Sequence, residues 1–212
     1  MIENKGWSLP DIDEHFHTYI GEFPITTYQQ KTIDAAYEYV TNFNCAIDVG
    51  ANIGLHSVRF ANKFSNVFSF EPVIANFECL EKNTNTFDNV KCFNNGLGNI
   101  SETLDIKIPS TSNNCGLYSL VDFEDVNNTI QETIEIIKLD DFDFAPDIIK
   151  IDTQGFEEKV LLGATKTLTL HSPVIIAECE SKAQKNKVNK MLDNLGYTFV
   201  GKYKKDFIWI KN

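Results

Sequence analysis

The stretch Cys45-Ala-Ile-Asp-Val-Gly-Ala-Asn-Ile-Gly-Leu-His56 decides the fold that we predict for this chain. Its first five residues form a short apolar run typical of a buried strand, and residues 54–64 carry apolar side chains at helical spacing. A glycine turn, residues 50–54, joins the two, and glycines let the backbone of such a turn approach a ligand closely. A strand that leads through a glycine turn into a helix is the opening unit of an α/β sheet.

Strand and helix patterns alternate on both sides of this unit. Further strands are predicted at 66–70, 90–94, 147–152 and 173–178, and helices at 28–43, 73–85, 157–167 and 181–195. Two last runs, 197–203 and 207–210, read as a closing hairpin. The alternation predicts an α/β domain over residues 28–212, with a Rossmann-like, doubly wound and mostly parallel sheet and an antiparallel C-terminal hairpin.

Two segments depart from this alternation. Residues 1–27 are rich in aromatic residues, and we interpret them as an irregular N-terminal extension that is a candidate lid over the site. Residues 101–137 form an insertion in which 103–108 and 133–137 alternate with period two, as antiparallel strands do. The long polar loop between these strands, residues 109–128, is expected to contact the acceptor because such loops are usually functional.

The composition excludes several classes of function. The chain has 212 residues, of which 42% are hydrophobic, and this suits one folded domain. Its net charge of −11 disfavours nucleic acid as a partner. The lysines of 182–190 are interpreted as a solvated helix face. The five cysteines are scattered without metal-ligand spacing, so neither a metal site nor a disulfide framework is predicted. Neither an apolar run of membrane-spanning length nor a signal-peptide core is found, so we expect a cytoplasmic protein.

Polar residues follow the predicted parallel strands at the edge where ligands bind in such sheets. Asp48 and the Gly50–Gly54 turn come after the first strand, and Glu71 after the second, 21 residues beyond Gly50. Later strands are followed by Asn95-Gly96-Leu97, by Asp152, and by Glu178 and Glu180. Lys150 shares the face of Asp152 and is expected to pair with it. The interval from Gly50 to Glu71 is that of an acid that binds a ribose.

The turn favours S-adenosylmethionine over a dinucleotide. Asn52 stands where the dinucleotide fingerprint requires its second glycine, and no basic residue adjoins the turn to meet a pyrophosphate. The acidic rim of Asp48, Glu71 and Asp152 suits a sulfonium cation. An NAD-type oxidoreductase is the competing enzyme, and a degenerate cofactor-binding scaffold is the alternative without activity.

Several motifs in order resemble the FkbM family of S-adenosylmethionine-dependent methyltransferases. They are Asp-Val-Gly-Ala-Asn-Ile-Gly-Leu-His (48–56), Phe-Glu-Pro (70–72) and Ile-Lys-Ile-Asp-Thr-Gln-Gly-Phe-Glu (149–157), joined by Asn95-Gly-Leu-Gly98 and Val160-Leu-Leu-Gly-Ala164. The resemblance covers residues 28–212. It departs at Thr153-Gln154, where many members have Val-Glu, and at Gly96, where alanine is usual.

The resemblance implies a class I methyltransferase fold and methyl transfer, commonly to a hydroxyl of a sugar, glycan or small natural product. It implies that Gly50, Asn52 and Gly54 line the methionine portion of the cofactor, that Glu71 binds its ribose, and that Asn95-Gly96-Leu97 flanks its adenine. Asp152 then lies at the reacting centre. It is our first candidate for a general base, and a carboxylate that holds the cofactor's amino group is the equal alternative. His56 and His15 are the other candidate bases.

Overall fold

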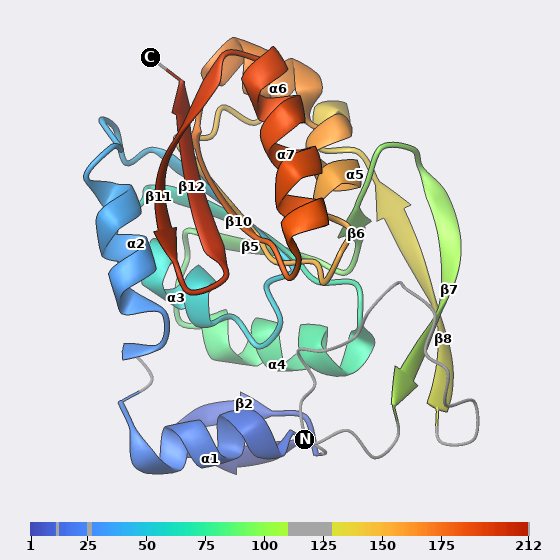
Figure 1. Ribbon diagram of the computed structural model, residues 1–212. Helices are drawn as coiled ribbons and strands as arrows, with labels where there is room; N and C mark the ends of the chain where they lie inside the picture. Colours follow the sequence, from blue (N-terminus) through green and yellow to red (C-terminus); the bar gives the residue numbers. More distant parts are fainter. Residues whose placement is uncertain (12, 25–26, 110–128, 212) are drawn as a thin grey trace.

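The protein is described by a computed structural model over residues 1–11, 13–24, 27–109 and 129–211. Within this part of the chain, the main sheet has seven strands in the order β11-β12-β10-β9-β3-β4-β5 (Figure 1). Their bounds are β3 Cys45–Val49, β4 Asn66–Phe70, β5 Val90–Phe93, β9 Ile148–Ile151, β10 Val174–Glu178, β11 Tyr197–Tyr203 and β12 Asp206–Lys211.

The main sheet is mostly parallel, as predicted. Neighbouring strands run parallel from β5 to β10, whereas β12 pairs antiparallel with both β10 and β11. All five residues of β3 and all four of β9 are buried, which explains their unbroken apolar character. The predicted fold class is confirmed: a Rossmann-like parallel sheet closed by an antiparallel C-terminal hairpin.

Helices cover both faces of the main sheet. The helices α2 (Gln30–Tyr37) and α3 (Leu55–Ala61) pack on one face, where Ile33 and Phe60 meet Ala46 and Ile148. The helices α5 (Glu157–Leu162), α6 (Thr165–His171) and α7 (Lys182–Asn194) pack on the other. The helix α4 (Ile74–Thr84) connects β4 to β5. Side chains of successive strand residues point to opposite faces of the sheet, so they pack into two separate hydrophobic cores.

Three predicted helices are shorter than their patterns suggested, and one of them, 54–64, is observed as α3 (Leu55–Ala61). The predicted helix 157–167 is interrupted between α5 and α6 at Gly163, where a Cβ atom would lie 1.8 Å from the Gly98 carbonyl oxygen. The predicted helix 28–43 ends at Tyr37, because the chain tightens there into turns closed by Tyr39 N–H to Ala36 O and Val40 N–H to Tyr37 O. Val40 remains buried, so its apolar periodicity reflects core packing beyond the helix.

The described residues of the N-terminal segment form regular secondary structure, so the prediction that this extension is irregular is wrong. The strands β1 (Ile2–Asn4) and β2 (Trp7–Leu9) form an antiparallel hairpin, and the helix α1 (Glu14–Glu22) follows. The carboxylate of Asp13 caps α1 by accepting a hydrogen bond of 2.8 Å from Phe16 N–H. Figure 1 shows this unit lying alongside α4.

A small core fixes the N-terminal unit to the rest of the protein. Leu9, Phe16 and Ile20 pack against Ile53 and Cys79. Polar contacts reinforce this packing: the Asn83 side chain of α4 accepts a hydrogen bond from Ser8 N–H and donates to the carbonyls of Ser8 and Ile53. The hairpin is therefore bound to the turn that follows β3 through side chains and backbone together.

The insertion forms a second, three-stranded sheet. The strands β7 (Glu102–Pro109) and β8 (Thr129–Ile137) are antiparallel, as predicted, and the short strand β6 (Gly96–Leu97) pairs parallel with β8. The segment 110–128, on which the prediction of an acceptor-binding loop rests, lies outside the described residues.

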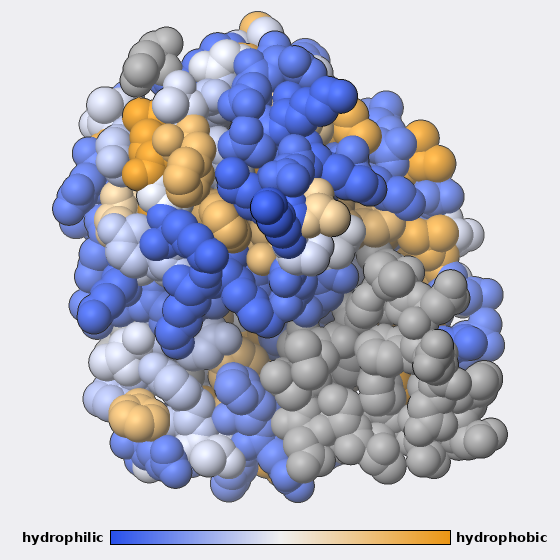
Figure 2. Space-filling view, viewed as in Figure 1, coloured by the Kyte–Doolittle hydropathy of each residue, from blue (hydrophilic) through white to orange (hydrophobic). Residues whose placement is uncertain are grey.

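The surface agrees with the interpretation of the lysine cluster. Figure 2 shows hydrophilic residues gathered over α7, where Lys182, Lys187 and Lys190 are exposed.

Among the helices of the described residues, none has the length and apolar character needed to cross a membrane. In the same residues, histidine, cysteine and acidic side chains form no group of three suited to hold a metal ion.

Candidate active site

A pocket of about 310 Å³ opens at the carboxyl ends of β3, β4, β9 and β10. This is the edge at which ligands bind in open α/β sheets. The main-sheet side contributes the turn after β3, Glu71, Asp152 and Glu178. Apolar side chains of the second sheet, Ile106, Ile134 and Ile136, close another side, and residues 15, 16, 28 and 29 complete the lining. The pocket thus joins an apolar part to a carboxylate-rich part.

The turn after β3 can be made only with glycine at position 50. Gly50 has a φ of +74°, and a Cβ atom there would lie 1.9 Å from the backbone oxygen of Asp152. The Gly50 and Ala51 N–H groups both donate to the Phe70 carbonyl, at 2.9 and 3.0 Å. Close approach of β3, β4 and β9 at this point places the turn in the pocket wall.

Glu71 is buried beside this turn. Its Oε2 accepts a hydrogen bond of 2.8 Å from Asn52 N–H, and its Oε1 accepts one of 3.0 Å from Val73 N–H. Burial raises the pKa of Glu71 to about 7, against the lowering effect of these hydrogen bonds. The carboxyl group therefore fixes the shape of the turn and lines the pocket with it.

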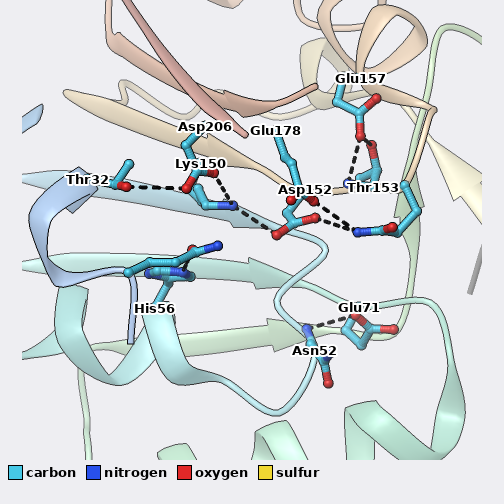
Figure 3. Close-up of polar contacts among 12 residues, drawn as sticks. Thr32, Asn52, His56, Glu71, Lys150, Asp152, Thr153, Glu157, Glu178 and Asp206 are labelled. Atoms are coloured by element: carbon cyan, nitrogen blue, oxygen red, sulfur yellow. Dashed lines mark hydrogen bonds and ion pairs between the residues drawn. The ribbon is translucent and has the colours of Figure 1, made fainter. Parts of the chain in front are cut away.

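A cluster of charged and polar side chains lies across the pocket from Glu71 (Figure 3). The Lys150 ammonium is fully buried and lies 3.1 Å from Oδ2 of Asp152. The Gln154 amide donates to Asp152 Oδ1 at 3.0 Å and to Glu178 Oε2 at 3.1 Å. Both oxygens of Asp152 are therefore engaged by donors of the chain itself, and Gln154 joins the two carboxyl groups.

The surroundings shift the pKa values of the residues in this cluster in different directions. Burial disfavours the charged form of Lys150, but the Asp152 and Asp206 carboxylates outweigh it and raise its pKa. Burial also acts to raise the pKa of Asp152, yet the Lys150 ammonium lowers it to about 2. Burial and the charge of Asp152 raise the pKa of Glu178 to about 8. At neutral pH, Asp152 therefore carries the charge and Glu178 the proton.

The strand register brings these side chains together. Asp206 of β12 pairs with Glu178 of β10, and Lys150 of β9 pairs with Asp48 of β3. Asp206 Oδ1 lies 3.8 Å from the Lys150 ammonium, and its Oδ2 accepts a hydrogen bond of 3.3 Å from the Thr32 hydroxyl. Lys150 is thus held between two carboxylates, which compensates the cost of its burial.

The two predicted histidines both line the pocket but differ in burial. His56 is buried, and its Nε2 lies 2.7 Å from Gln29 Oε1. Burial and the nearby Lys150 charge hold its pKa well below the usual value, so the ring is neutral. His15 is exposed at the pocket edge. The ring of Tyr28 lies between Phe16 and His56, with centroids 5.3 and 6.3 Å away.

Three residues predicted to bind the cofactor do not line the pocket. Asp48 is buried behind it, and its Oδ2 accepts a hydrogen bond of 2.6 Å from Ser57 Oγ, because the strand pleat turns it toward α3. Gly54 packs against α4, where a Cβ atom would lie 2.9 Å from Leu80 Cδ1. Asn95 donates to Glu135 on β8 at 3.2 Å. In this structure these three residues therefore contact neighbouring parts of the protein and not the pocket.

The other predicted residues are brought together. Gly50, Asn52, Glu71, Gly96, Leu97, Asp152, His56 and His15 all line the pocket. Gln154, Tyr28 and Glu178 also line the pocket, although the sequence analysis gave none of them a role in the site. The available signal for Glu178 was its place after a buried strand beside β9, whereas nothing in the sequence placed Tyr28 near Asp152. The predicted pair of Lys150 and Asp152 is confirmed.

Residues 48–199 match the family described as the methyltransferase FkbM domain. The chain belongs to this family. S-adenosylmethionine is the methyl donor of methyltransferases with this fold, so the cofactor prediction agrees with the family assignment. No curated protein matches the chain.

The fold of this FkbM-family chain is similar to several solved structures. Methyltransferase FkbM from Methylobacillus flagellatus KT has 18% identity and a TM-score of 0.56, over 95% of this chain and 56% of that protein. The chain thus spans little more than half the length of this relative. Precorrin-6y C5,15-methyltransferase from Geobacter metallireducens GS-15 has 16% identity and a TM-score of 0.52, over 86% and 89% of the two chains. Magnesium protoporphyrin IX methyltransferase from Synechocystis PCC 6803, solved with bound SAM, has 9% identity and a TM-score of 0.51, over 87% and 80%.

Proposed function

We propose that this FkbM-family protein transfers the methyl group of S-adenosylmethionine to a hydroxyl oxygen of a sugar, glycan or small natural product. The observation that carries the proposal is one pocket that joins the Gly50 turn and Glu71 to the carboxyl pair of Asp152 and Glu178. The Gly50 turn and Glu71 suit a nucleoside. Asp152 and Glu178 suit a hydroxyl that loses a proton during the reaction.

The residues of the pocket fit the cofactor. Glu71 faces the pocket with a carboxyl group that suits the ribose hydroxyls, next to the backbone of Asn52. Gly96 and Leu97 line the pocket beside Pro72, where a Cβ atom on Gly96 would lie 2.5 Å from Ile136 Cδ1. The apolar lining by Leu97, Pro72 and Ile136 suits a flat adenine ring. The carboxylate of Asp152 suits the positively charged groups of the methionine portion.

The chemistry divides between cofactor and protein. When bound, S-adenosylmethionine supplies an electrophilic methyl group, whose transfer leaves S-adenosylhomocysteine and releases the hydroxyl proton of the acceptor. The protein aligns the acceptor, which can contribute roughly 7–11 kcal/mol. It also holds Asp152 ionised at the carboxyl end of β9, where this carboxylate orients the neighbouring groups through Lys150 and Gln154.

The histidines are weaker candidates for a base. His56 is neutral, but its Nε2 is engaged with Gln29. His15 lies at the exposed edge of the pocket, where it suits contact with the acceptor better than proton transfer. Of the lysines and arginines among the described residues, Lys205 alone lines the pocket, and its ammonium is bound to Glu180. The NAD-type alternative is therefore disfavoured.

The partner proposed is therefore a small-molecule or glycan acceptor, and nucleic acid is disfavoured by the net charge of −11. We keep the cytoplasm as the proposed location, because S-adenosylmethionine is available there.

Calorimetry with S-adenosylhomocysteine tests the cofactor, with an expected dissociation constant in the micromolar range, about −8 kcal/mol. Turnover is then measured as transfer of radiolabel from S-adenosylmethionine to methyl glycosides and hydroxylated aromatic compounds. Binding of NADH without binding of S-adenosylhomocysteine would contradict the proposal. If label is transferred only to amines, the acceptor atom is a nitrogen and the proposed hydroxyl acceptor is wrong.

A further inference from the structure

We propose that Glu178, and not Asp152, takes the proton of the acceptor hydroxyl, while Lys150 and Gln154 hold Asp152 as a positioning residue. This inference rests on the proposed function and names a further catalytic residue for it.

The geometry distinguishes the two carboxyl groups. The Lys150 ammonium occupies Oδ2 of Asp152, and the Gln154 amide occupies Oδ1. Glu178 accepts from the same amide at Oε2 and also contacts the Asp152 carboxyl group. Figure 3 shows Glu178 and Asp152 side by side, with the Lys150 ammonium on the Asp152 side of the pair. A proton from a ligand in the pocket therefore meets, at Asp152, a carboxylate that already accepts from the Lys150 ammonium and the Gln154 amide. At Glu178 it meets a carboxyl group that shares the Gln154 amide with Asp152.

The backbone fixes this arrangement. Parallel pairing sets Ala177 beside Ile151, so Glu178 and Asp152 follow at the ends of neighbouring strands. Gln154 reaches both from a turn in which its own φ is +51°. The side chain that bridges the two carboxyl groups is thus held by local backbone conformation, which makes the bridge a built feature of the site.

The proton affinities agree with this assignment. A carboxylate with a pKa of about 2, such as Asp152, is a poor acceptor for a proton, whereas a pKa of about 8 places Glu178 near the working pH. Several charged or titratable groups act on Glu178 or lie beside it in the pocket: Lys150 of β9, Asp152 just after β9, Asp206 of β12, Tyr28, Lys205 and Glu180. The charges of Asp152 and Lys150 act on the pKa of Glu178 in opposite directions, since Asp152 raises it and Lys150 lowers it. Glu178 must lose its own proton before it can accept one from the acceptor. The rate of transfer should for this reason rise with pH through about 8.

The first experiment is a carboxyl titration. Protein labelled with ¹³C in its glutamate carboxyl groups and saturated with S-adenosylhomocysteine is followed by NMR, and Glu178→Gln assigns the resonance of Glu178. We expect a midpoint near 8 that falls by more than about one pH unit in Asp152→Asn, since that change removes the neighbouring negative charge. A midpoint in the ordinary glutamate range, or one unchanged by Asp152→Asn, would overturn the proposal.

The second experiment measures turnover with methyl glycosides. Glu178→Gln should lower kcat by roughly 10²–10⁴-fold, keep the affinity for S-adenosylhomocysteine and lose the rise of rate with pH. Glu158→Gln, a half-exposed side chain in the first turn of α5, is the matched control. A kcat for Glu178→Gln within about threefold of that control would overturn the assignment, because loss of a general base costs far more. If the wild type binds no S-adenosylhomocysteine, the proposed function fails, and titration of the free protein still decides the protonation of Glu178.

Discussion

The alanine substitution of Gly50 tests whether the turn after β3 depends on the absence of a side chain. Two costs add at this position. A left-handed backbone costs a residue with a Cβ atom about 1–2 kcal/mol, and Gly50 has a φ of +74°. The new methyl group would also lie 1.9 Å from the Asp152 carbonyl oxygen. Forcing a core to accommodate extra atoms costs roughly 1–3 kcal/mol. We therefore expect Gly50→Ala to lower the free energy of unfolding by about 2–5 kcal/mol.

Gly6→Ala is the matched control for this change. Gly6 has a φ of +84° in the β1–β2 turn, but a Cβ atom there would have no neighbour within 4 Å. Its substitution carries only the backbone cost, so the difference between the two variants isolates the contact with Asp152. Urea unfolding of both variants gives this difference, expected at about 1–3 kcal/mol. Equal losses of stability in the two variants would refute the argument, because the close approach of β3 and β9 would then be tolerant of a methyl group.

Three other substitutions probe the wider site. Glu71→Gln should weaken binding of S-adenosylhomocysteine by about 1.5–3 kcal/mol in calorimetry. Because the pKa of Glu71 is raised to about 7, the folded wild type binds more protons than the unfolded chain between about pH 4.5 and 7. The free energy of unfolding should therefore fall as the pH rises through this range. Urea unfolding of Glu71→Gln should show a smaller fall. Asn83→Ala should lower the free energy of unfolding by about 1–3 kcal/mol and expose residues 1–22 to limited proteolysis, whereas Asn85→Ala, at an exposed position just after α4, should do neither. Asn95→Ala should leave the affinity for S-adenosylhomocysteine unchanged within about twofold, since Asn95 does not line the pocket; a loss of about tenfold would restore its predicted role.

The main sheet was predictable because its strands are continuous apolar runs. Cys45–Val49 and Asn66–Phe70 have the predicted bounds, and burial on both faces leaves such a run little choice of structure. The N-terminal hairpin was not predictable, because its strands have three residues each and lack a local pattern. Its stability comes from tertiary contacts of Leu9 and Asn83 with distant residues.

The site was predictable where it depends on local spacing. Gly50 and Glu71 belong to turns at strand ends, and Lys150 and Asp152 are two positions apart on one strand face. The contact of Glu178 with Asp152 depends on the register of β9 with β10, which a single sequence does not encode locally. Asp48 lies near the end of β3, but its side chain faces the core and not the pocket. Its place in the sequence does not reveal this direction.

The hydrogen bond between Thr32 and Asp206 joins residues 174 positions apart and completes the surroundings of the Lys150 ammonium. During synthesis, β3, β4, β5, β9 and β10 leave the ribosome before β12, which must then pair between β10 and β11. Until it does, the nascent chain lacks one of the two carboxylates that neutralise Lys150, and an uncompensated buried charge is costly. The charged edge of the pocket is therefore completed last, when Asp206 of β12 pairs with Glu178 of β10.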